Sequence, residues 1–177
     1  TVDHPFFPSE GYKNDVYLEL GTTLFGGSSA YTKLRLDHSR YFEVKDGGYV
    51  LAFRGVGGRL LGGHLDENDK FRIGGADTLR GYTYGDPALS LVGDNMLVFN
   101  AEFRFPIVDK VQGVVFTDWG TTWDKGGVVQ LQDLRNSFGL GVRLDTPLGL
   151  LRLDYGWGKD VEDNRKGQFY FGIGQTF

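Results

Sequence analysis

Apolar and polar residues alternate with a period of two along most of this chain, and this pattern limits the fold more than any other feature. Between residues 96 and 106 the apolar positions are Leu97, Phe99, Ala101, Phe103 and Phe105, and the positions between them are Val98, Asn100, Glu102 and Arg104. Such alternation places each kind of side chain on one face of a β-strand. The pattern recurs in eight segments, at residues 15–25, 31–42, 49–61, 96–106, 111–123, 136–146, 150–157 and 168–177. No segment shows convincing helical periodicity, so we expect an all-β fold of eight antiparallel strands in up-and-down order.

Alternation alone does not say which face of the sheet contacts water. A soluble lipocalin-like barrel has its apolar side chains inside, whereas a transmembrane barrel has them outside, in contact with lipid. Here the polar face is rich in glycine and in opposite charges, such as Glu102 with Arg104, Arg143 with Asp145, and Arg152 with Asp154. Near strand ends the apolar face carries aromatic residues, as interfacial girdles do: Trp119, Trp123, Tyr155, Trp157 and Phe177. These features favour a transmembrane β-barrel.

The connections between the expected strands also alternate in length. Those at residues 43–48, 107–110 and 145–149 are short, whereas those at 61–95, 124–135 and 159–167 are longer. Short periplasmic turns and longer extracellular loops are typical of outer-membrane barrels. No window holds about 18 consecutive apolar residues, so a transmembrane helix is excluded. We therefore expect a single domain over residues 1–177 that lies in a bacterial outer membrane, with the lipid bilayer as its partner.

Other chemistry finds little support in the sequence. The net charge of −4 gives no reason to expect a nucleic-acid partner. His4, His38 and His64 lack metal-ligand spacing, and the chain contains no cysteine to join them. There is no Gly-x-Ser-x-Gly motif and no plausible Ser/His/Asp set. We expect no enzymatic activity, no catalytic residue, no metal and no cofactor.

The connection from residue 61 to residue 95 is far longer than the others. A connection of this length is usually either functional or disordered. Its central stretch, Phe71–Tyr84, reads FRIGGADTLRGYTY, and it combines several apolar residues with a central arginine, Arg80, that has glycines on either side of it in the stretch. Disordered linkers are not composed in this way. We expect an ordered extracellular loop with a function.

Four motifs, in chain order, resemble the BamA family of outer-membrane insertases and transporters in the surface-antigen superfamily. FFPSEG at 6–11 resembles the start of a family strand, and TPLGLLRLDYG at 146–156 resembles a turn and strand near the family's C-terminus. VFTDWGTTWD at 115–124 resembles the family's Phe-x-Asp-x-Gly strand motif, here with Phe116 and Gly120. GGADTLRGY resembles the diagnostic tip of the sixth extracellular loop, here Gly74, Gly75, Leu79, Arg80, Gly81 and Tyr82. The last strand, with Phe171, Ile173, Gly174 and the terminal Phe177, resembles the aromatic signal that the outer-membrane assembly machinery reads.

The resemblance implies a mechanism for the long loop. In the family its arginine folds back into the lumen of the barrel and pairs with acidic side chains on the inner wall. Here those positions are Arg80, with Glu102 and Asp118, and both acids already fall on the polar face of their strands. An arginine can engage carboxylates in a bidentate way that lysine cannot reproduce. The implied function is insertion or translocation of proteins, with unfolded outer-membrane proteins as substrates.

Two departures from the family leave alternatives open. The family barrel has sixteen strands and this chain has eight, and the family's periplasmic receptor domains are absent from this chain. The chain is then half of a larger barrel, one of two copies that together form a sixteen-stranded barrel, or a small barrel of its own. The last case includes a structural or engineered mini-barrel without insertase activity. A soluble lipocalin-like binding barrel is the remaining alternative. No signal peptide begins the sequence, so we expect a mature, processed or shortened chain.

Overall fold

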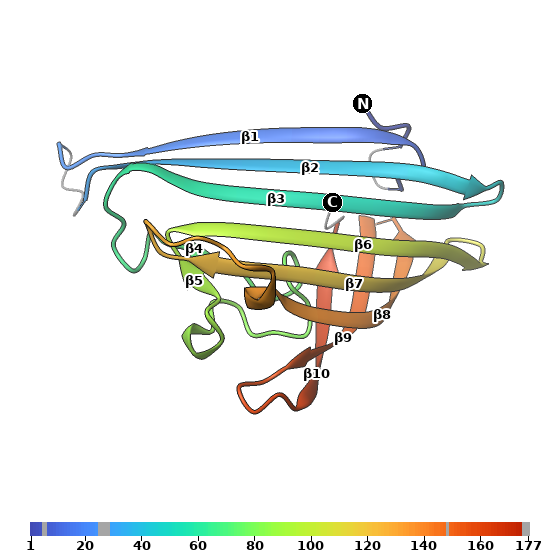
Figure 1. The fold of residues 1–177 in the computed structure, drawn as a ribbon. Coiled ribbons are helices and arrows are strands. Elements are labelled where there is room, and N and C mark those ends of the chain that lie inside the picture. Colours follow the sequence, from blue (N-terminus) through green and yellow to red (C-terminus); the bar gives the residue numbers. More distant parts are fainter. Residues whose placement is uncertain (5–6, 25–28, 148, 175–177) are drawn as a thin grey trace.

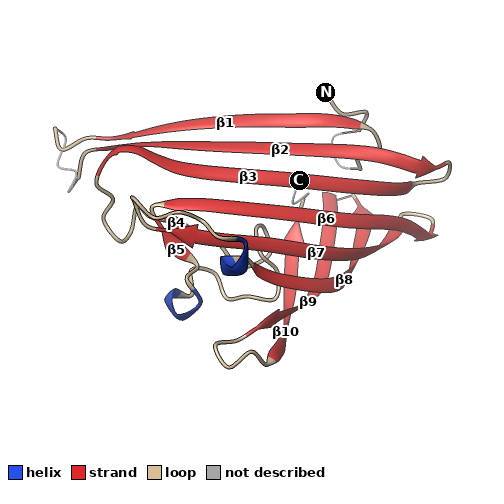
Figure 2. Ribbon diagram, in the orientation of Figure 1, coloured by secondary structure: helices blue, strands red, loops and turns tan. Residues whose placement is uncertain are grey.

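The computed structural model is built almost wholly of β-strands, and it describes residues 1–4, 7–24, 29–147 and 149–174 (Figures 1 and 2). Eight long strands form one sheet: β1 (Gly11–Gly21), β2 (Tyr31–Lys45), β3 (Tyr49–Gly63), β6 (Asn95–Val108), β7 (Val111–Trp123), β8 (Arg135–Thr146), β9 (Gly149–Lys159) and β10 (Arg165–Ile173). They lie in the order β1-β2-β3-β6-β7-β8-β9-β10, and every pair is antiparallel. Within the described residues, no helix has the length and apolar character needed to cross a membrane.

The predicted all-β, up-and-down order of eight strands is confirmed, with some different bounds. The first strand runs from Gly11 to Gly21 instead of 15–25, because β1 pairs with β2 from Gly11 opposite Tyr41 to Gly21 opposite Tyr31. The long connection is shorter than predicted, since β3 continues to Gly63. It also contains structure of its own. Two short strands, β4 (Phe71–Arg72) and β5 (Val92–Gly93), pair antiparallel. The 3₁₀ turn η1 (Pro87–Leu89) lies between them in the chain. A second 3₁₀ turn, η2 (Leu131–Asp133), precedes β8.

The sheet curls but does not close. In Figure 1, β9 and β10 run at a steep angle to β1, β2 and β3. Among the described residues, β1 pairs with β2 alone and β10 pairs with β9 alone, so two edges remain open. Of the alternatives left open by the sequence, the small closed barrel of eight strands does not describe this structure. The interior of a closed eight-stranded barrel is just filled by side chains, whereas here the long loop occupies the concave side of the sheet.

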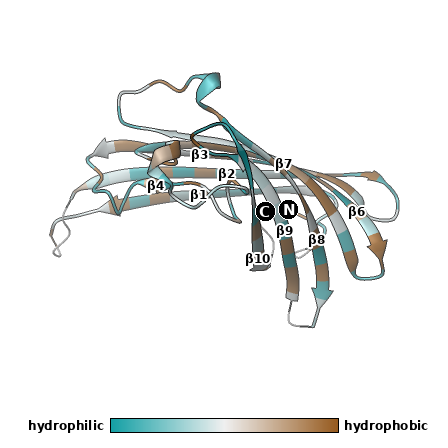
Figure 3. Ribbon diagram, turned by 90° about the horizontal axis from the view of Figure 1, so that it is seen from below, coloured by the Kyte–Doolittle hydropathy of each residue, from teal (hydrophilic) through white to brown (hydrophobic). Residues whose placement is uncertain are grey.

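The two faces of the sheet differ in burial as well as in polarity. Figure 3 shows hydrophobic and hydrophilic residues alternating along β8 and β9. The convex face exposes large apolar side chains, among them Leu18, Leu36, Phe99, Leu140 and Phe171. The concave face buries polar ones, among them Arg54, Asn100, Glu102, Asp118, Arg143 and Asp154. A soluble barrel has the reverse arrangement, so the lipocalin-like alternative does not describe this fold.

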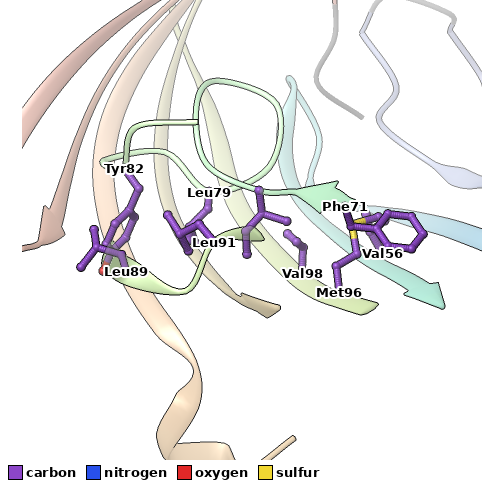
Figure 4. Close-up of a cluster of buried hydrophobic side chains, with 9 residues drawn as sticks. Val56, Phe71, Leu79, Tyr82, Leu89, Leu91, Met96 and Val98 are labelled. Atoms are coloured by element: carbon purple, nitrogen blue, oxygen red, sulfur yellow. The ribbon is translucent and has the colours of Figure 1, made fainter. Parts of the chain in front are cut away.

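The largest apolar cluster joins the long loop to the concave wall (Figure 4). The loop supplies Phe71, Ile73, Leu79, Tyr82, Leu89 and Leu91, and the wall supplies Val56, Met96 and Val98. All nine side chains are less than a tenth exposed. Burial of large apolar side chains stabilises a fold by about 1.5–3 kcal/mol each. The loop is thus packed against β3 and β6 as part of the protein core.

Candidate functional site

The tip of the long loop is folded sharply by two glycines. Gly74 and Gly75 have φ angles of +110° and +77°, which residues other than glycine rarely adopt. The amide of Gly75 donates a hydrogen bond to the carbonyl of Tyr82 at 2.8 Å and closes the tip. A Cβ atom at Gly74 would lie 2.4 Å from the carbonyl oxygen of Thr83. The glycine pair therefore allows the chain to turn back and present Arg80 to the wall.

Arg80 is enclosed by two carboxylates from neighbouring strands. Its Nε and Nη2 atoms each donate to the Asp118 carboxylate at 2.8 Å, in the bidentate geometry that favours arginine. The Arg80 amide donates to the same carboxylate at 3.1 Å, and Nη1 donates to Glu102 at 2.6 Å. Arg80 is 1 % exposed, and both acidic side chains are fully buried. The loop thus adds a buried cation between β6 and β7.

The guanidinium of Arg80 lies over an aromatic ring, that of Phe116. The Cζ atom of Arg80 lies 3.5 Å from the centroid of the Phe116 ring, within the range of a cation–π contact. Phe116 and Asp118 are two residues apart on β7 and therefore share its concave face. A Cβ atom at Gly139 would lie 2.2 Å from the Phe116 ring, so glycine on β8 makes room for the ring. Gly120, also predicted in this strand motif, packs near Ile73.

The carboxylates of the concave face also bind other arginines. Glu102 accepts from Arg104 at 2.9 Å, as its sequence neighbourhood suggests. Arg143 pairs with Asp154 at 2.6 Å, whereas Asp145, the acidic residue nearest to it in the sequence, is exposed. In the β8–β9 register Asp154 lies opposite Gly141, which makes Arg143 its diagonal neighbour on the same face.

Arg152 of β9 binds the long loop. It pairs with Asp77 of the loop at 2.8 Å, and not with Asp154. Asp77 precedes the Arg80 tip, and its carbonyl accepts a hydrogen bond from Arg54 of β3 at 2.8 Å. The loop therefore contacts β3 and β9 as well as the strands between them.

The charge state of Arg80 follows from these neighbours. Burial alone would lower the pKa of Arg80, but the charges of Asp118 and Glu102 outweigh it and raise the pKa above its ordinary value. Asp154 adds to this effect, with its carboxylate 3.5 Å from Nη1 of Arg80. The neighbouring carboxylates therefore stabilise the charged form of the guanidinium.

The residues after Arg80 contact the last three strands of the sheet, β8, β9 and β10. The Gly81 amide donates to the Tyr170 hydroxyl at 2.8 Å, and the Tyr82 hydroxyl donates to the carbonyl of Asn136 at 2.7 Å. Gly81 packs directly on the β9 backbone, where a Cβ atom would lie 2.5 Å from the amide nitrogen of Gly158. Leu79, on the other side of Arg80, is fully buried in the apolar cluster.

Several of these contact residues escaped the sequence analysis. Tyr170 and Asn136 were not singled out by any motif. Asn100 was placed on the polar face, but nothing in the sequence indicated that it donates to both Asp118 and the Thr78 carbonyl. One signal was present: Gly156 and Gly158 alternate on the polar face of their strand, as expected where another backbone approaches closely.

The predicted C-terminal signal lies apart from this site. Phe171 and Ile173 of β10 point to the convex face and are 59 % and 65 % exposed. Gly174 follows the strand with a φ of +89°. Phe177 lies outside the described residues, as does Phe6 of the first motif.

Comparison with known proteins assigns the family. The model of the Omp85 superfamily domain matches residues 1–177. The chain is 37 % identical over 127 residues to the chloroplastic outer envelope protein 80 of Arabidopsis thaliana, covering 65 % of this chain and 16 % of that protein. It is 29 % identical over 194 aligned positions to the outer membrane protein assembly factor BamA of Nitratidesulfovibrio vulgaris, covering 100 % of this chain and 24 % of BamA.

A solved structure shares the fold. The crystal structure of BamA from Haemophilus ducreyi superposes with a TM-score of 0.76 at 21 % identity, covering 97 % of this chain and 39 % of that one. The chain thus spans a quarter or less of the length of these curated relatives. The match of the family model to every residue shows that this chain belongs to the Omp85 superfamily.

Proposed function

We propose that this chain forms eight strands of an outer-membrane barrel that inserts or translocates other proteins, with unfolded outer-membrane proteins as its substrates. The observation that carries the proposal is the buried ion cluster of Arg80, Asp118 and Glu102, because burying three charges is costly unless their geometry is fixed. The names of two relatives support it, since one is an outer membrane protein assembly factor and the other an outer envelope protein. Nothing in this role requires a catalytic residue.

Within this function the Arg80 cluster locks the loop to the barrel wall. The loop carries one cation to two carboxylates on β6 and β7, and Gly81 and Tyr82 bind β8, β9 and β10 next to it. A loop held at this many strands keeps the inner wall rigid while substrate segments pair at the rim. Loss of Arg80 would leave Glu102 and Asp118 buried without their loop partner.

The open edges require further strands. In a bilayer every backbone N–H and C=O group needs a partner, so a sheet with two open edges cannot stand alone in lipid. We propose that eight further strands complete a sixteen-stranded barrel, either from the same protein or from a second copy of this chain. The 39 % coverage of the Haemophilus ducreyi chain supports a larger parent barrel. An open edge also offers hydrogen bonds to an incoming strand.

The insertion role is tested by reconstituting the full-length protein in liposomes with an unfolded small barrel as substrate. We expect faster folding of the substrate than in empty liposomes, and an Arg80→Ala variant that has lost most of this acceleration. Arg35→Ala is the matched control, because Arg35 lies on the same face of the sheet with its side chain 37 % exposed. Equal folding rates in loaded and empty liposomes would rule out the insertase function.

The assembly is tested with cysteines at Leu18 of β1 and Ile173 of β10. A link within one chain would mean that its first and last strands meet, and would exclude both forms of the sixteen-stranded barrel. A link between two chains on a denaturing gel supports the two-copy barrel. Absence of both links, with each single cysteine reactive toward a small thiol reagent, favours eight further strands from the same protein.

A further inference from the structure

The convex face of the sheet has a hollow where β3 lacks side chains. Gly55 and Gly57 both point to this face, and a Cβ atom at either position would meet nothing within 4 Å. A cavity of about 520 Å³ lies over them, bordered by Leu97, Phe99, Trp119 and Leu134. Its volume is in the range of ligand pockets, which are usually lined by apolar and aromatic groups. The hollow is therefore shaped for an apolar chain.

A second cavity of about 600 Å³ lies further along β3 and carries positive charge. Arg59 is two residues beyond Gly57 on the same face, which separates the two by about 7 Å. Arg59 and Lys125 line this cavity together with Leu61, Trp123 and Val128.

Neither cation of this cavity is neutralised by an ion pair within the described part of the chain. Arg59 is exposed, and the Lys125 ammonium donates to the carbonyl of Gly63 at 3.0 Å. The nearby Asp94 is 8 % exposed and accepts from the Lys125 amide at 2.9 Å. The cavity therefore offers two cationic side chains to an anion.

The loop between β7 and β8 borders both cavities. It supplies Lys125 and Val128 to the charged cavity and Leu134 to the apolar one. Val128 is 82 % exposed. Along β3, the apolar hollow thus lies near the middle of the strand, and the two cations lie near the end at which the long loop begins. An anionic amphiphile at a membrane surface has the same order, with its chain below its charged headgroup.

We propose that this face binds an anionic glycerophospholipid, with one acyl chain in the Gly55–Gly57 hollow and its phosphate at Arg59 and Lys125. The inference rests on the membrane placement within the proposed function, and not on insertion activity. A free anion would leave the apolar hollow unfilled, and an uncharged lipid would leave Arg59 without a partner. Guanidinium and ammonium groups are the usual donors to phosphate oxygens.

Arg40 offers a comparison on the same face of the sheet. Its guanidinium lies 5.8 Å from the Tyr12 ring and 5.1 Å from the Phe42 ring, so it is a cation among aromatic residues. Its partner in β3 is Phe53, a large side chain, whereas the approach to Arg59 is through glycine. We therefore expect general membrane attraction at Arg40 and a formed site at Arg59.

The test measures lipid binding to the full-length protein in a neutral detergent by native mass spectrometry. The probes are phosphatidylglycerol, diacylglycerol with the same chains, and lipid A. We expect bound phosphatidylglycerol, with affinity about fivefold weaker in Arg59→Gln, because one surface cation contributes about a factor of five. Gly57→Leu, which fills the hollow, should weaken binding by a similar factor. Arg40→Gln and Ala101→Leu are controls that change the same face elsewhere and should bind as the parent does.

Three outcomes overturn the inference. Equal binding of diacylglycerol would mean that the phosphate is not recognised, and unchanged affinity in both Arg59→Gln and Gly57→Leu would place the lipid elsewhere. Tighter binding of lipid A than of phosphatidylglycerol would give the site a different occupant. Lipid binding at this site in a protein that fails the liposome folding assay would reject the insertase function and leave this inference standing.

Discussion

β7 and β1 show how differently one pattern can be used within a single sheet. Both strands alternate in sequence, yet the concave side of β7 is buried, with Phe116 2 % and Asp118 0 % exposed. In β1 both faces are open, and the neighbouring residues Val16 and Tyr17 are 68 % and 54 % exposed. The difference follows from the long loop, which covers the concave side of β7. Alternation decides which face a side chain takes, and the loop decides whether that face becomes core.

The same contrast separates the ion pairs of the two regions. Around Arg80 every partner is almost fully buried, so each charge depends on the others. On β1 and β2 the Lys33–Glu19 pair has side chains 12 % and 54 % exposed, and water can replace either partner. Buried pairs are costly to break, whereas exposed pairs contribute little. Substitutions in the two regions should therefore differ severalfold in their effect.

The largest effect is expected from Arg80→Ala, which leaves Glu102 and Asp118 buried without their loop partner. We expect the free energy of unfolding to fall by about 3–5 kcal/mol. Urea titration of the refolded protein in lipid vesicles measures it. Arg80→Lys keeps the charge but loses the bidentate contact and should recover only part of the loss. A fall of less than about 1 kcal/mol for Arg80→Ala would mean that the cluster does not hold the loop.

Gly81→Ala should have the next largest effect, because it places a methyl group 2.5 Å from the Gly158 amide nitrogen at a φ of +89°. We expect a loss of about 1–3 kcal/mol and faster trypsin cleavage after Lys70 and Arg72 in the loop. Gly126→Ala is the matched control, since Gly126 has a similar φ of +87° and open space around it. Equal cleavage in both variants would attribute the effect to backbone strain alone, and not to contact with β9.

Tyr170→Phe tests how firmly the loop tip is bound to β10. The Tyr170 hydroxyl accepts from the Gly81 amide and lies 3.1 Å from the Tyr82 carbonyl, so its removal leaves a partly buried amide without its partner. We expect a loss of about 1–2 kcal/mol, measured in the same urea titration. Tyr155→Phe, on the convex face of β9, is the control and should change stability by less. If the two variants behave alike, the bond to the loop tip contributes nothing specific.

The covered region could be predicted from sequence better in its strands than in its contacts. Alternation placed Glu102 and Asp118 on the polar face, because the strand period is two and cannot shift without moving every side chain. It did not reveal that Arg143 binds Asp154, since cross-strand partners depend on register and not on sequence distance. Opposite charges near in sequence, such as Arg143 and Asp145, therefore need not form a pair.

Neither the closure of the sheet nor the secondary structure inside the long loop could be predicted from the sequence. Whether eight strands close depends on strand tilt, shear and what fills the interior, and the pattern of β1 is the same in an open or closed sheet. The paired strands Phe71–Arg72 and Val92–Gly93 are too short to show an alternation of apolar and polar residues. The glycine pair at 74–75 was part of the loop motif in the sequence, and both residues have positive φ angles, which glycine adopts at low cost.

The smallest effect is expected in the uncovered region, from Glu19→Gln on β1. Glu19 binds the Lys33 ammonium at 3.1 Å and accepts from the Tyr31 hydroxyl at 2.6 Å, and glutamine keeps an acceptor for the hydroxyl. Because Glu19 is 54 % exposed, we expect a loss of less than about 1 kcal/mol in the urea titration. Lys13→Gln, which removes an exposed partner of Asp15 on the same strand, should behave alike. A loss for Glu19→Gln as large as that for Arg80→Ala would mean that β1 is covered in the protein under test, and that β1 and β7 do not differ there in burial.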